Sequence, residues 1–128
     1  MPLNNFAEVI PIIAAQVWLP GDTTTFKDIL AAQPTIYRFD VALAINDDSV
    51  IHVFALQLKD PTGGIHGFGS VSIPANAGHT TVPMFDVFAN LFPVAQVGIA
   101  VPVGWILEGA LLVTATNAVG LVLTGGYF

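Results

Sequence analysis

The chain has 128 residues, enough for one domain that buries roughly two-thirds of the surface its unfolded form exposes, and too few for two such domains. Hydrophobic residues make up 54% of the chain and charged residues only 9%, whereas ordinary soluble domains carry about 25% charged residues. So few charges argue against an ordinary monomeric surface. The chain either spans a membrane or covers a second apolar surface with a partner.

The longest apolar runs do not fit a membrane span. Residues 9–19 contain Pro11 and residues 97–107 contain Pro102, and neither run supplies the roughly 20 uninterrupted apolar residues that a helix needs to cross a bilayer. The first basic residue is Lys27, so the positively charged start of a secretory signal is missing, and we expect the N-terminus to be mature sequence. Association with a protein partner is therefore the better interpretation.

Charge and cysteine content exclude further classes. The chain has no cysteine, which removes disulfides, thiolate chemistry and Cys-ligated zinc and fits synthesis in a reducing cytosol. Its net charge is −6, with only three Lys and Arg residues, whereas a nucleic-acid interface needs several of them facing phosphates. We therefore expect neither nucleic acid nor a membrane as a partner.

The first 34 residues differ from the rest. Residues 9–19 are extended and apolar, and a polar link at residues 21–25 follows them. Such a segment is either an arm laid on a neighbouring subunit or an edge strand of the same domain. We accordingly divide the chain into residues 1–34, the arm or edge strand, and residues 35–128, a β-sandwich domain.

Strict alternation of side chains begins at residue 36 and predicts a half-buried strand. Asn and Asp at residues 46–48 supply turn chemistry, and the alternation resumes over residues 50–58, which completes a hairpin. The residues predicted to share one face of the first strand are Tyr37, Phe39, Val41, Leu43 and Ile45.

The second half of the chain predicts further short strands and one helix. Strands are expected near residues 67–73, 96–101, 105–114 and 119–123, separated by turn residues. Between them the spacing of Phe85, Phe88, Leu91 and Phe92 predicts a short helix that ends before Pro93 and covers an open end of a sheet pair. The fold class is therefore all-β, an antiparallel β-sandwich or jelly roll with one short helix.

The strand at residues 105–114 is apolar on both faces. A sandwich strand that meets solvent should alternate with polar residues, so we expect this one to be covered from outside by the arm, by another protomer, or by loops of its own domain. From this strand and the N-terminal segment we predict the following interface residues: Phe6, Val9, Ile12, Val17, Trp18, Ile106 and Leu112.

No motif for catalysis or metal binding emerges. The histidines, His52, His66 and His79, are widely spaced, and Asp47, Asp48 and Asp60 are explained by turn formation, with a loop calcium site as the alternative. The three serines, at positions 49, 70 and 72, do not lie in a nucleophile elbow, and the carboxylates are dispersed. We predict no catalytic residue, no metal and no cofactor, and thus a protein that is not an enzyme; a jelly-roll hydrolase is the competing hypothesis.

Three aromatic residues allow a different binding hypothesis. Trp18, Trp105 and Tyr127 could form a stacking platform for a sugar, because aromatic faces are apolar while the indole and phenol groups can form hydrogen bonds. Packing in the core or in an interface is the alternative interpretation of the same residues.

Five segments stand out in their order along the chain: residues 37–41, 71–78, 85–92, 103–107 and 115–119. In the order of these features, residues 37–123 resemble the small β-sandwich virion proteins of tailed bacteriophages. The resemblance implies a structural role, as a capsid cement or decoration protein or as a tail or fibre component, often as a trimer. The sequence departs from that group in its longer, more apolar N-terminal part and in having no evident receptor-binding insertion.

These observations lead to one functional expectation and one alternative. We expect a capsid cement or decoration protein that forms a homo-oligomer, a trimer by the resemblance, and binds the major capsid protein or another virion protein. Its location would be the virion, after assembly in the host cytoplasm. The alternative is a tail, fibre, receptor-binding or glycan-binding β-sandwich module.

Overall fold

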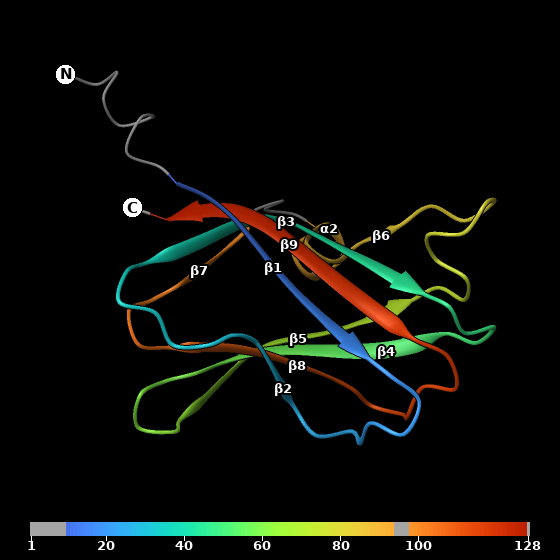
Figure 1. The fold of residues 1–128 in the computed structure, drawn as a ribbon, viewed down its shortest axis with the longest axis horizontal. Coiled ribbons are helices and arrows are strands. Elements are labelled where there is room, and N and C mark those ends of the chain that lie inside the picture. Colours follow the sequence, from blue (N-terminus) through green and yellow to red (C-terminus); the bar gives the residue numbers. More distant parts are fainter. Residues whose placement is uncertain (1–9, 94–97, 128) are drawn as a thin grey trace.

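A computed structural model describes residues 10–93 and 98–127 and shows two antiparallel sheets packed face to face (Figure 1). The first sheet, sheet A, has the strand order β1-β9-β3-β6, and β7 also pairs with β3; the second, sheet B, has the order β2-β8-β4-β5. This arrangement confirms the predicted all-β sandwich. The strands are β1 (Ile10–Trp18), β2 (Lys27–Leu30), β3 (Tyr37–Asn46), β4 (His52–Lys59), β5 (Ile65–Ile73), β6 (Phe85–Asp86), β7 (Ile99–Val101), β8 (Ile106–Leu111) and β9 (Val119–Tyr127).

The predicted helix is present and short. Helix α2 (Val87–Leu91) begins after Asp86, whose side chain accepts a hydrogen bond from the Ala89 backbone N–H and so caps the helix. Val87 and Phe88 are buried, and the helix contacts β3 of sheet A and β5 of sheet B. It therefore closes the space between the two sheets along one side, which is close to the covering role that the sequence predicts.

The N-terminal part of the described chain belongs to the sandwich. Strand β1 pairs with β9 along its whole length, from Ile10 opposite Tyr127 to Trp18 opposite Val119, and is the edge strand of sheet A. Strand β2 is one of the two edge strands of sheet B. Residues 10–18 therefore form an edge strand of the same domain, which is one of the two alternatives for this segment. Phe6 and Val9 lie outside the described residues.

One β-bulge changes which residues of β3 face the core. The pairing of β3 with β9 shifts between Phe39 and Val41, so that Asp40 is the extra residue. Phe39 is buried, as are Ala42 and Ala44 beyond the bulge. The expectation that every odd-numbered residue of residues 37–45 shares one face is therefore wrong after Phe39, because a single inserted residue exchanges the two faces of a strand.

Strand β8 is mostly buried on both faces within a single chain, and Ile106 on the outer face is half-buried. The strand lies between β2 and β4, and Ala110, whose side chain belongs to the outer face, is 0% exposed. Ala110 is therefore buried without a second protomer over this strand. Beyond the strand, Leu112 and Val113 are exposed.

Candidate interaction surface

The outer face of sheet A carries exposed apolar side chains from several neighbouring strands. Strands β1, β9 and β3 place their outward residues in three rows that follow directly from the strand register. We define the outer face of sheet A by these rows, which are Ile13, Thr124 and Val41; Ala15, Val122 and Leu43; and Val17, Gly120 and Ile45.

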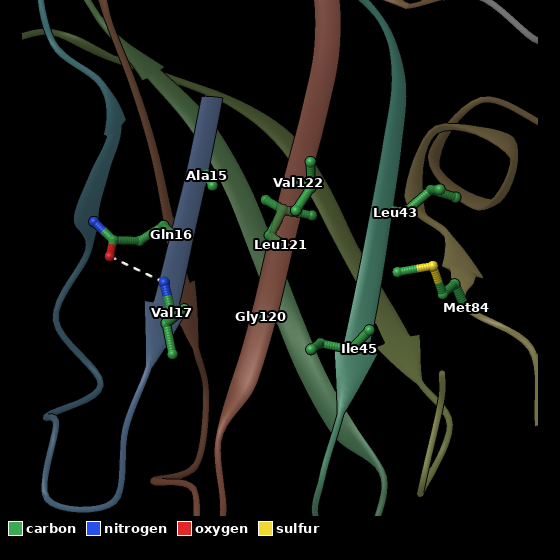
Figure 2. A pocket seen from close by; sticks show the side chains of 9 residues that line it. All are labelled: Ala15, Gln16, Val17, Leu43, Ile45, Met84, Gly120, Leu121 and Val122. Carbon is green, nitrogen blue, oxygen red and sulfur yellow. Dashed lines mark hydrogen bonds between the residues drawn. The ribbon is translucent and has the colours of Figure 1, made fainter. Parts of the chain in front are cut away.

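A hollow of about 120 Å³ lies at the third row of this face. It exists because Gly120 has no side chain at the centre of the row, and a Cβ added there would lie 3.0 Å from Cγ1 of Ile45. Figure 2 shows the side chains around it, with Met84 approaching from the side of β3. The residues that line it are Ala15, Gln16, Val17, Leu43, Ile45, Met84, Gly120, Leu121 and Val122.

The face combines exposure with an absence of charge. Ile13 is 76% exposed, and Val17, Val41 and Val122 are each about two-fifths exposed. None of the nine positions in the rows is charged. Apolar side chains gathered on one sheet face at this exposure are typical of an interaction site.

Charged residues lie only around the border of this face in the described part of the chain. Arg38 and Asp40, 4.0 Å apart, stand at the end where β3 begins, and Asp47 follows the opposite end of β3. Asp86 lies beside Leu43 on the short strand β6, where it caps helix α2. The border is therefore polar around an uncharged centre, as in many protein interfaces.

Close backbone contacts accompany the bulge in β3, and the bulge turns Val41, Leu43 and Ile45 outward. A Cβ on Gly125 would lie 1.8 Å from the carbonyl oxygen of Arg38, and one on Gly98 would lie 1.8 Å from that of Phe39. The two glycines thus allow neighbouring backbone to approach β3 at the bulge. Past the bulge Val41, Leu43 and Ile45 point outward, and the small residues Ala42 and Ala44 face the core.

The predicted interface residues divide between several places. Val17 belongs to the outer face of sheet A, whereas Ile12 is partly buried and packs against the core. Trp18 is only 1% exposed and packs edge-on against Phe54, with ring centroids 5.1 Å apart, so its prediction as an interface residue is wrong. Alternation along β1 turns Trp18 inward, away from Val17. Ile106 and Leu112 belong to the β8 region of sheet B, on the other layer of the sandwich.

The aromatic platform does not form. Trp18 and Tyr127 lie at opposite ends of the β1–β9 ladder, since they pair with Val119 and Ile10 respectively. Tyr127 stacks on Tyr37 with ring centroids 5.0 Å apart. Trp105, next to β8, instead packs against His66. A single sugar therefore cannot contact all three aromatic rings.

The three histidines occur in three separate pairs with aspartates. His52 pairs with Asp48, His66 with Asp60 at 2.9 Å, and His79 with Asp47 at 2.8 Å. Within residues 10–93 and 98–127 no group of three or more His, Cys, Asp or Glu side chains is placed to hold a metal ion. Over the same residues no helix is long and apolar enough to cross a membrane.

The sequence did not predict most of the outer face of sheet A. Val41, Leu43 and Ile45 carried a clear alternation signal, but that signal grouped them on one face with Phe39, which is buried. The glycine at position 125 was the available clue, because glycine inside a strand often marks a bulge or a close backbone approach. Met84 and Gly120 come next to Ile45 only through tertiary contacts.

Comparison of this chain with models of protein families, with curated proteins and with solved structures finds no match.

Proposed function

We propose that this chain is a structural, non-enzymatic protein of the capsid-decoration type, which attaches to its neighbours through the outer face of sheet A. The observation that carries the proposal is the uncharged, three-row apolar face, with Ile13 76% exposed and a hollow at Gly120. The resemblance to phage virion proteins supplies the setting: the major capsid protein or another virion protein as partner, on particles assembled in the host cytoplasm.

The size of the face suits repeated weak contacts. At a strand spacing of about 4.8 Å and a rise of about 3.3 Å per residue, a patch three strands wide and five residues long covers about 240 Å². A standard stable interface buries about 800 Å² on each partner, so one contact through this face is weak. On a particle surface many such contacts act together, and avidity makes the attachment stable.

Incorporation into particles tests the proposal. Particles purified from the source of the chain should contain it in many copies, as measured by quantitative mass spectrometry. Val17→Asp should lower the incorporated amount at least tenfold, because it places a charge in the apolar face. Val113→Asp is the matched control, since Val113 is 66% exposed and lies outside this face. A chain absent from particles, or equal incorporation of the two variants, would contradict the proposal.

A further inference from the structure

We infer that Tyr37 and Tyr127 are a site of oxidative modification, at which a one-electron oxidant joins the two phenol rings by a carbon–carbon bond. The start of β3 and the end of β9 lie side by side at one end of the sandwich, and the strand register places Tyr37 directly opposite Tyr127 (Figure 1). The two rings are stacked, with their centroids 5.0 Å apart and their planes inclined by only 10°. This site is separate from the rows of the outer face of sheet A, so it is independent of the proposed function.

The composition of the chain makes this pair its natural covalent cross-link. The chain has no cysteine, so it offers neither a disulfide nor a thiol that would quench a tyrosyl radical. It has only two tyrosines, and the fold stacks those two on each other although they lie far apart along the sequence. Both tyrosines are partly exposed and accessible to an oxidant in solvent, whereas Trp18 is only 1% exposed.

The two tyrosines fasten the end of the β3–β9 ladder that has the fewest side chains. Beyond the bulge at Asp40, only three residues of β3 pair with β9, and two of their partners are Gly125 and Gly126. Glycine adds no side chain to cross-strand contacts, so the stacked rings supply the side-chain contact between these strands. The hydroxyl of Tyr37 donates a hydrogen bond of 3.3 Å to Oε1 of Gln33, which orients its ring.

Stacking is the geometry that radical coupling requires. Removal of one electron and one proton from a phenol leaves an unpaired electron shared between the oxygen and several ring carbons. Among these carbons only the Cε atoms carry a hydrogen that a new bond can replace. The unpaired electron occupies p orbitals perpendicular to the ring plane, so the orbitals of two stacked rings point at each other. Groups held together in this way react as if they were at very high concentration.

The reaction balances with hydrogen peroxide as the oxidant, activated by a haem peroxidase. Each tyrosine gives up one electron and one proton, and one Cε of Tyr37 bonds to one Cε of Tyr127. The hydrogen on each of these carbons then moves through solvent to the phenol oxygen, and the electrons and protons removed reduce one peroxide to two waters. The strands part slightly in the product, because its rings are no longer stacked. The ladder opens only at its end, since Tyr37 is the first residue of β3 and Tyr127 the last of β9.

Peroxidase and hydrogen peroxide applied to the native chain, followed by mass spectrometry, test the site. At about 1 μM chain, the main linked product should be a monomer lighter by two hydrogen atoms, in about tenfold or greater excess over linked dimers, because groups on one chain have effective concentrations in the millimolar range. Trypsin cleaves after Lys27, Arg38 and Lys59, which are the only Lys and Arg residues of the chain. The cross-link should therefore appear as residues 28–38 joined to residues 60–128, with the fluorescence of dityrosine.

Matched variants separate the native stack from chance encounters. Tyr37→Phe and Tyr127→Phe each keep a ring in the stack but remove one phenol, so neither should give the linked peptide. Tyr37→Phe combined with Val113→Tyr keeps two tyrosines but places the new one after β8, beside the start of β4 and away from the start of β3. Its intrachain yield should be about tenfold lower or less, and the wild-type yield should fall about fivefold or more in urea, because the rings are no longer held together.

Three results would overturn the inference. The linked peptide is absent after oxidation of the native chain, the tyrosines link only between molecules, or the native and urea-unfolded chains give equal yields. The linked chain should also unfold at a higher urea concentration than the untreated chain, because the new bond restricts the unfolded state. An unchanged midpoint would contradict the fastening of β3 to β9.

Discussion

The Asp48 carboxylate accepts a hydrogen bond from the ring of His52, and both side chains are 2% exposed. The same carboxylate accepts backbone N–H bonds from Thr116 at 2.9 Å and from Asn117. Asp48 thereby ties the connection between β3 and β4 to the connection between β8 and β9. Burial alone would raise the pKa of Asp48, but these hydrogen bonds outweigh burial and hold the pKa below its usual 3.8.

Removing this charge should destabilise the sandwich. Asp48→Asn replaces an acceptor of three hydrogen bonds by an amide that cannot accept all of them, so we expect the melting temperature to fall by several degrees. Asp47→Asn is the control, because the side chain of the neighbouring Asp47 is partly exposed and pairs with the exposed His79. Equal melting temperatures of the two variants, measured by circular dichroism, would refute this role of Asp48.

Acid should unfold the protein through the carboxylates whose pKa values are lowered. The hydrogen bonds that Asp60 accepts from His66, Thr62 and Gly64 lower its pKa, as hydrogen bonding does for Asp48. Near pH 4 and below, the unfolded chain therefore binds more protons than the folded chain. The stability that these groups contribute is present above about pH 5 and is lost as the pH falls.

Urea unfolding at a series of pH values measures this effect. The free energy of unfolding of the wild type should decrease between about pH 5 and about pH 2, and Asp60→Asn should reduce the slope. Asp40→Asn is the control for the same chemical change at an exposed aspartate. Identical slopes in the wild type and in Asp60→Asn would show that Asp60 makes no such contribution.

Glycine at position 125 should be required for the bulge. In Gly125→Ala the new Cβ would lie 1.8 Å from the Arg38 carbonyl oxygen, so strands β3 and β9 must separate or shift register. We expect a loss of about 2 kcal/mol or more in the free energy of unfolding. Gly67→Ala is the control, because nothing lies within 4 Å of the added Cβ. Similar urea midpoints for the two variants would argue against the bulge geometry.

Phe54 should be a main support of the core. It is 1% exposed and contacts Trp18 edge-on, and a Cβ on Gly109 would lie 2.5 Å from its ring. Phe54→Ala should cost about 3–5 kcal/mol in urea unfolding and shift the Trp18 fluorescence to longer wavelength as water enters. Val113→Ala, at an exposed site, should change stability by less than about 0.5 kcal/mol. A small effect of Phe54→Ala would mean that sheet B packs differently.

Strand β3 shows where sequence reasoning succeeded and where it failed. The strand itself was predictable, since alternation and the turn at residues 46–48 are local signals. Phe39 was grouped with Tyr37, Val41, Leu43 and Ile45 on one face, and Phe39 is buried. Val41 and Leu43 were assigned to the same face, yet they point outward, because the bulge at Asp40 depends on Gly125 of a strand more than eighty residues away.

The amino-acid sequence by itself determined the class of the fold: short strands, turns and one helix follow from periods and turn residues that act over a few neighbours. It also determined that the chain carries too few charges for an ordinary surface. Only the tertiary structure decided where the exposed apolar residues gather and which aspartate pairs with which histidine. Those outcomes depend on strand register and on contacts between distant segments, and a shift of one residue in register exchanges a buried face for an exposed one.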